Sequence, residues 1–163
     1  MDKIRHTLML RESEKRIGAA ALLRDAGDDS DSAYLLRLLG FELLRKVVVE
    51  QQTSSVPHGH KYAELFASLP ASVQSDLLRL SGERIGPSGL TTTHATVLGD
   101  LGRNFVGLRY PYEKYGDMTQ AEYERIGQDW IEAGAGNAGA EYRYHPEELF
   151  GLIVALQQVA NAG

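Results

Sequence analysis

AYLLRLLGFELLRKVVVEQQ, residues 33–52, is the segment that decides the fold of this chain. Leu36, Leu39, Leu43 and Val47 recur at the spacing of one helix face and form an apolar stripe. Other faces of the segment are apolar too, and a helix that is apolar nearly all round is either central or shared with a partner. The β-branched run that begins at Val47 would also suit a strand, but the stripe continues through it and no second strand candidate exists. We therefore predict a central helix.

The remaining sequence predicts further helices, each with an apolar stripe or a boundary signal. These segments are residues 2–25, 60–69, 70–81, 91–109, 119–133 and 146–159. Thr119 and Glu122 match a capping box, which starts a helix. Pro111 disfavours the α conformation at Tyr110, so the helix before it should end or kink there. Pro146 occupies a favourable first-turn position.

These elements predict a single-domain, all-α chain over residues 1–163, an up-and-down bundle of about six or seven helices. Residues 134–145 begin with a glycine-rich run and are expected to form a flexible connector before the C-terminal helix. Residues 134–139 match the letters G-x-G-x-x-G. A dinucleotide-binding motif needs a strand before these glycines and a helix directly after them, which the pattern does not offer. The connector is therefore the preferred interpretation.

Composition excludes several classes of protein. A hydrophobic content of 43% argues against wholesale disorder. The net charge of −5 means that any nucleic-acid contact must come from a local basic patch. The absence of cysteine excludes disulfides, thiolate zinc sites and cysteine nucleophiles. The charged N-terminus does not resemble a signal peptide, and no apolar run is long enough to span a membrane. We therefore expect a cytoplasmic protein without a membrane association.

Histidines form one local cluster, His58 and His60, with His94 and His145 elsewhere in the chain. Two imidazoles in a loop could hold a metal ion, but a secure site needs three or four ligands at defined spacing. No such spacing is visible. We therefore expect no metal site, and a role for His60 in capping or orienting the helix that follows it.

The segment RNFVGLRYPYE, residues 103–113, ends a predicted core helix with unusually many polar groups. Arg109 would lie on the apolar stripe if the helix reached it, and a buried arginine requires a partner. Glu113, four residues on, is the local candidate for an ion pair. Alternatively, the arginines Arg103 and Arg109 could bind phosphate through their forked donors. The residue chemistry leaves these two interpretations equally weighted.

Three segments, taken in order, resemble the HEPN superfamily of small helical nucleotide- and RNA-associated domains. Residues 35–46 look like the long family helix with an internal Glu and a nearby Lys, and residues 59–66 are similar to the GH-x-L-x-x-LF start of the next helix. Residues 103–113 resemble a helix with Arg-Asn that runs into an RY-x-YE ending. The resemblance covers residues 33–113, about half of the chain.

The resemblance implies a bundle that associates with RNA, and in catalytic members a metal-independent endoribonuclease without a cofactor. Arg103 and Asn104 match the start of the nuclease motif, in which Arg steadies phosphate charge and a histidine moves a proton. The motif histidine would fall at residues 108–110, where this chain has none, so the motif is degenerate. His60, from another helix, is the candidate substitute.

The same resemblance points to Arg109, Tyr110 and Lys61 as RNA-binding side chains. It also implies a homodimer and a partner protein within a prokaryotic defence or toxin–antitoxin system. The missing histidine and the acidic net charge leave two further hypotheses open. One is a catalytically inactive helical binding or dimerisation module, and the other is a nucleotide-binding domain without nuclease activity.

Overall fold

Helix α2 (Ser32–Thr53) lies at the centre of the fold, as its apolar pattern predicts. It packs along α1 (Lys3–Asp25), crosses α8 (Pro146–Ala162) and contacts α5 (Gly89–Gly107). Its buried residues therefore lie on several faces and include Val47, Val48 and Val49, so the β-branched run is helical. Packing against neighbouring helices outweighs the weak preference of valine for strands here.

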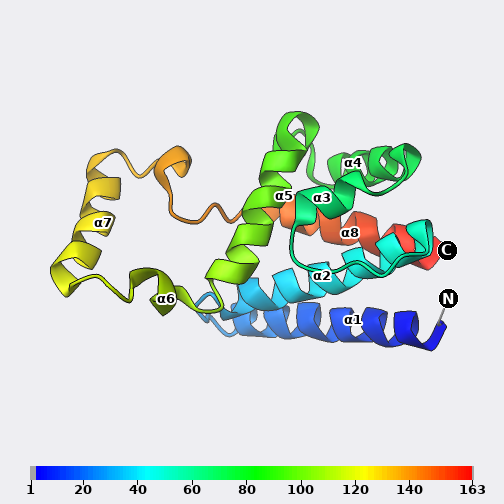
Figure 1. Ribbon diagram of the computed structural model, residues 1–163, viewed down its shortest axis with the longest axis horizontal. Coiled ribbons are helices and arrows are strands. Elements are labelled where there is room, and N and C mark those ends of the chain that lie inside the picture. Colours follow the sequence, from blue (N-terminus) through cyan, green and yellow to red (C-terminus); the bar gives the residue numbers. More distant parts are fainter. Residues whose placement is uncertain (1–2, 163) are drawn as a thin grey trace.

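The computed structural model describes residues 3–162, and this part of the chain contains eight α-helices, one 3₁₀ helix and no strand (Figure 1). The elements not yet given are α3 (Tyr62–Ala67), α4 (Ala71–Ile85), α6 (Pro111–Tyr115), α7 (Gln120–Glu132) and the 3₁₀ helix η1 (Asn137–Gly139). The all-α prediction is confirmed. Within the described residues, no helix has the length and apolar character needed to cross a bilayer.

The core lies between α2, α4, α5 and α8, and α3 closes it on one side. Helix α4 packs on α8, and α3 packs on α5. The largest fully buried side chains belong to these five helices, namely Leu38, Phe41, Leu44, Val47, Val48, Tyr62, Leu77, Val97, Leu98, Leu101, Leu149 and Leu152. Burying a side chain of this size contributes about 1.5–3 kcal/mol. The core therefore fixes α3 and α5, the two helices that carry the candidate site residues.

Three helix boundaries around α4 and α5 differ from the sequence-based prediction. Helix α4 continues to Ile85 and α5 begins at Gly89, so the gap between the helices predicted over 70–81 and 91–109 is only three residues long. Helix α5 ends at Gly107, and a short additional helix, α6, begins at Pro111. The proline ends one helix and starts another because its fixed φ suits a first helical turn.

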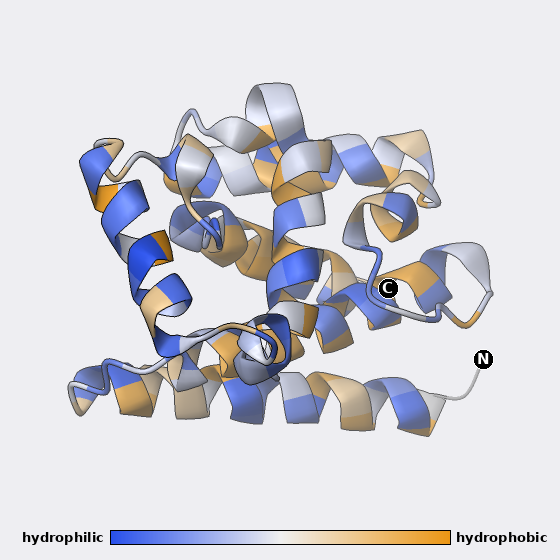
Figure 2. Ribbon diagram, turned by 60° about the vertical axis from the view of Figure 1, so that its left-hand side comes forward, coloured by the Kyte–Doolittle hydropathy of each residue, from blue (hydrophilic) through white to orange (hydrophobic). Residues whose placement is uncertain are grey.

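Residues 111–145 form an arm that projects from the bundle (Figures 1 and 2). Helices α6 and α7 and the turn η1 bury no residue. The capping box of Thr119 and Glu122 is confirmed at the start of α7. Residues 134–139 follow a helix and contain only η1, so the strand that a dinucleotide site requires is absent from this segment.

A close backbone approach joins the chain before α3 to the middle of α5. A Cβ atom placed on Gly102 would lie only 2.6 Å from the carbonyl oxygen of His60. Glycine at this position therefore lets residue 60 lie directly against α5. This approach places the segment around His60 beside the α5 face that carries Arg103.

Candidate functional site

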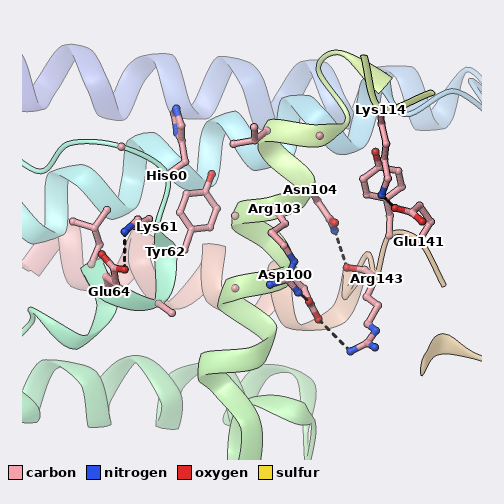
Figure 3. A pocket seen from close by; sticks show the side chains of 18 of the residues that line it. His60, Lys61, Tyr62, Glu64, Asp100, Arg103, Asn104, Lys114, Glu141 and Arg143 are labelled. Carbon is pink, nitrogen blue, oxygen red and sulfur yellow. Dashed lines mark hydrogen bonds and ion pairs between the residues drawn. The ribbon is translucent and has the colours of Figure 1, made fainter. Parts of the chain in front are cut away.

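A pocket of about 1390 Å³ opens between the start of α3, one face of α5 and the end of the arm. Its walls include residues 58–65, residues 99–107 in part, and residues 140–143 (Figure 3). Both His60 and Arg103 line it, although no hydrogen bond or ion pair between them is found among the described residues. The structure therefore brings the two candidate catalytic side chains to one pocket without direct contact.

His60 is held by Glu42, a carboxylate that is only 5% exposed. The Nδ1 atom of His60 lies 2.6 Å from Oε2 of Glu42, and the same oxygen accepts a bond of 3.0 Å from the Tyr62 hydroxyl. Lys46 donates to the other oxygen at 2.8 Å. With Nδ1–H donating to the carboxylate, Nε2 is the ring nitrogen that can accept a proton.

The charge state of Glu42 depends on these donors. Burial raises the pKa of Glu42, but the hydrogen bonds from Lys46 and His60 and the charges on both outweigh it, so the pKa lies below its ordinary value. The ionised Glu42 carboxylate accepts from Nδ1 of His60 and so fixes the orientation of the ring. The pair therefore has the arrangement of a general acid–base group with an orienting carboxylate.

Arg45 packs against the ring of Tyr62, beside Glu42. Its guanidinium lies 4.3 Å from the centre of the Tyr62 ring, and the residue is 2% exposed. No hydrogen-bond partner is found for it among the described residues. Burial lowers the pKa of Arg45 to about 10, opposed by the charges of Tyr62 and Glu42. The cation–π contact supports the ring that in turn positions Glu42.

A second buried carboxylate, Asp100 on α5, holds a second histidine. Asp100 is 3% exposed and lies 2.8 Å from Nε2 of His145, which directly precedes α8. It forms an ion pair with Arg103, and Arg143 approaches to 3.9 Å. Three potential cations thus surround one carboxylate. Arg103 keeps 72% of its side chain exposed, so its guanidinium is accessible from the pocket.

Asn104 has a structural position. It is 2% exposed, and its side-chain amide donates to the Tyr34 hydroxyl at 2.9 Å and to the Arg143 carbonyl at 2.7 Å. Figure 3 shows it turned toward Arg143. Tyr34, which accepts from this amide, is itself largely buried, and burial is the main cause that raises the pKa of its hydroxyl. The amide therefore links α5 to α2 and to the end of the arm.

The ion pair between Arg109 and Glu113, one of the two interpretations that the sequence left open, is wrong. No ion pair joins these side chains in the described part of the chain, and Arg109 is exposed with its guanidinium 4.6 Å from the Phe105 ring centre. Helix α5 ends before Arg109, and Tyr110 is the N-cap of α6. The two residues consequently do not share a continuous helical turn.

The predicted RNA-binding residues lie at different places around the pocket. Lys61 and Tyr110 line it, with Lys61 77% exposed and paired to Glu64 at 3.0 Å. Tyr110 is half exposed and contacts Tyr112 edge to face. Arg109 lies outside the pocket wall.

Charges in the pocket wall are nearly balanced. Its four cationic side chains, Lys61, Arg103, Lys114 and Arg143, all face carboxylates. The matching carboxylates are Glu64, Asp100 and Glu141. The pocket is therefore polar and ion-paired, and it is not a strongly basic surface of the kind that binds extended nucleic acid.

Sequence reasoning assigned no role in the site to three residues that organise it, namely Glu42, Asp100 and His145. Asp100 and Arg103 have the i, i+3 spacing of a helical ion pair, which was a usable signal. His145 carried no comparable signal, because its partner lies 45 residues away. No group of three or more His, Asp or Glu side chains that could hold a metal ion occurs in residues 3–162.

Comparison of the chain with protein-family models, with curated proteins and with solved structures finds no match. The function must therefore be argued from the geometry of the site.

Proposed function

We propose that the chain is a HEPN-like, RNA-associated helical domain that cleaves RNA without a metal ion, with His60 as the proton-transfer group. One observation carries the proposal: a buried carboxylate holds His60 at a pocket that also contains an exposed arginine, Arg103. The ordered resemblance of residues 33–113 supports the choice of RNA as substrate.

The proposed chemistry is transesterification, in which the phosphoryl group is transferred from the 5′-oxygen of the next nucleotide to the neighbouring 2′-oxygen. Nε2 of His60 takes the proton of the 2′-hydroxyl, whose oxygen then bonds to the adjacent phosphorus. The bond from phosphorus to the 5′-oxygen breaks, and that oxygen takes a proton from solvent water, while the protonated His60 returns its proton to solvent. The products are a 2′,3′-cyclic phosphate and a 5′-hydroxyl. Arg103 supplies guanidinium donors to the phosphate oxygens as charge develops.

The test is cleavage of single-stranded RNA by purified protein in the presence of EDTA, with detection of the cyclic phosphate. His60→Ala should lower the rate at least about 100-fold, the usual contribution of a general base. His94→Ala is the control, because His94 is also a histidine but lies outside the pocket wall. Circular dichroism melts check that each variant is folded. Absence of cleavage by the wild type, or equal cleavage by His60→Ala, would reject the proposal.

The balanced charges of the pocket favour a second candidate, a catalytically inactive helical binding or dimerisation module. Each pocket cation already faces a carboxylate, so little charge is left for phosphate. This function predicts that wild type and all pocket variants leave RNA intact. A nucleotide-binding domain would instead show a rise in melting temperature with nucleotide, because a ligand that binds only the folded state stabilises it.

The wider setting of the proposal rests on the same resemblance. We propose a cytoplasmic homodimer that works with a partner protein in a defence or toxin–antitoxin system. Asn104, Arg109, Tyr110 and Lys61 belong to this proposal as the family-implied residues. Co-purification of the tagged chain with a protein from its own cells tests the partner.

A further inference from the structure

The arm and the outer face of α1 carry matching features that the bundle does not use. Helix α7 buries none of its residues, although Tyr123, Ile126 and Trp130 follow one another at spacings of three and four. Their exposed fractions are 54%, 37% and 38%. Within the arm, Tyr123 meets the Tyr115 ring edge to face and Trp130 donates to the Gly136 carbonyl, but all three side chains still keep more than a third of their surface exposed. A helix of 13 residues gains most of its stability from packing of such a face. We call these three residues the α7 stripe.

Helix α1 presents a second stripe of the same spacing. Leu8, Arg11, Lys15, Gly18 and Leu22 follow one another at intervals of three and four, so they share one face of the helix, on which Leu8 and Leu22 are the apolar residues. Leu8 and Leu22 are 49% and 73% exposed. We call these five residues the α1 stripe.

The α1 stripe points away from the protein interior. The residues of α1 that are buried toward the bundle are His6, Ser13 and Ala20, and on a helical wheel they lie opposite the stripe. The apolar residues of α1 that pack against the core are Met9, Leu10 and Ile17. The exposed Leu8 and Leu22 are therefore left for a partner.

Charge identifies that partner. Helix α7 contains four acidic residues and one basic residue, a net charge of −3, whereas α1 contains six basic and three acidic residues, a net charge of +3. No ion pair is found for Asp129 on α7 or for Arg11 on α1 among residues 3–162. Two copies of α7 would repel each other, whereas α7 of one copy and α1 of another would attract each other.

Two glycines agree with a close helix contact. Gly18 lies in the α1 stripe and Gly127 lies beside the α7 stripe, and a Cβ on either would meet nothing within 4 Å in this chain. Glycine inside a helix costs about 1 kcal/mol relative to alanine. The chain itself gives no packing reason for either glycine, whereas a partner helix would approach more closely at such positions.

We propose that the α7 stripe of one copy packs on the α1 stripe of a second copy, so that two arms reach reciprocally across a symmetric dimer. Within one copy, α7 stands away from α1 (Figure 1). This contact rests on the homodimer proposed above and supplies its interface. It uses neither the pocket nor its chemistry, so a failure of the contact is distinguishable from a failure of RNA cleavage.

Light scattering on a size-exclusion column, over a range of concentrations, tests the proposal. Wild type should be a dimer, and Ile126→Glu and Leu22→Glu should each raise the dissociation constant at least about 30-fold, as expected for a central interface residue. Ile131→Glu is the matched control: it is 65% exposed on another face of α7 and should leave the dimer intact. Higher salt should weaken the dimer, because the two helices carry opposite charge.

Each contrary outcome overturns the proposal. A wild-type monomer at every concentration rules out the dimer. Dissociation by Ile126→Glu without an effect of Leu22→Glu would place α7 against another surface. Dissociation by Leu22→Glu alone would remove α7 from the contact, and equal loss in Ile131→Glu would mean that the stripe has no special role. Circular dichroism melts establish that the variants remain folded, which is expected because both helices carry these residues on exposed faces.

Discussion

Glu42 and Asp100 are both buried carboxylates that hold a histidine, yet they join different parts of the molecule. Glu42 receives Lys46, His60 and Tyr62, so it fixes the start of α3 against the central helix. The partners of Asp100 are mostly on the segment that returns from the arm. The first pair belongs to the interior, and the second fastens the arm to the bundle.

The surroundings of the two carboxylates also differ. Tyr62 is 1% exposed, and the Lys46 and His60 side chains are 20% and 33% exposed, so each donor around Glu42 keeps at most a third of its surface in water. Arg103 is 72% exposed and the Arg143 side chain is 38% exposed. Loss of the carboxylate should therefore be severe at Glu42, where donors stay buried, and milder at Asp100, where they return to solvent.

The largest effect is expected for Glu42→Ala. Removing it leaves the Tyr62 hydroxyl without its acceptor and Arg45 without a nearby negative charge. We expect the free energy of unfolding to fall by about 3–5 kcal/mol, the range for breaking a buried charge pair. Urea unfolding followed by circular dichroism measures it. Glu64→Ala, at an exposed carboxylate, is the control and should change stability by less than about 1 kcal/mol. Equal effects of the two substitutions would contradict the comparison.

Asp100→Ala should have a smaller and more local effect. We expect a loss of about 1–3 kcal/mol, since a few hydrogen bonds to charged groups are removed while both arginines regain water. Hydrogen exchange should become faster at the start of α8 and in residues 143–145, and it should be unchanged in the middle of α2. Faster exchange throughout α2 would mean that Asp100 supports the core and not only the arm.

The two carboxylates also show which features of the structure could be predicted from the sequence. The apolar stripe of α2 and the capping box at Thr119 are local signals, so they predict their elements correctly. Glu42 and Lys46 were already visible as an i, i+4 pair on one helix. No local pattern predicts the other two partners of Glu42. His60 and Tyr62 come from a different part of the chain and reach Glu42 only in the folded structure.

Predictions failed where the chain changes direction. The expected pairing of Arg109 with Glu113 assumed a continuous helix, whereas Pro111 begins a separate one. The role expected for Asn104 came from resemblance, and burial against Tyr34 became visible only in three dimensions. His145 is the extreme case, because its contact with Asp100 depends on where the whole arm returns to the bundle.

The smallest effect concerns pH and separates the charge of Glu42 from its packing. Burial raises its pKa, but the donors from Lys46 and His60 lower it more, so the folded pKa lies below the ordinary value of 4.5. A depressed folded pKa contributes stability that is complete above the unfolded pKa and is lost as the pH falls through the folded pKa. Wild type should therefore lose stability more steeply below about pH 4.5 than Glu42→Gln, which cannot titrate. Urea unfolding of both proteins at a series of pH values measures this difference, with Glu64→Gln as the exposed control. Parallel pH profiles for wild type and Glu42→Gln would show that Glu42 stabilises the fold through the geometry of its hydrogen bonds and that its negative charge adds nothing measurable.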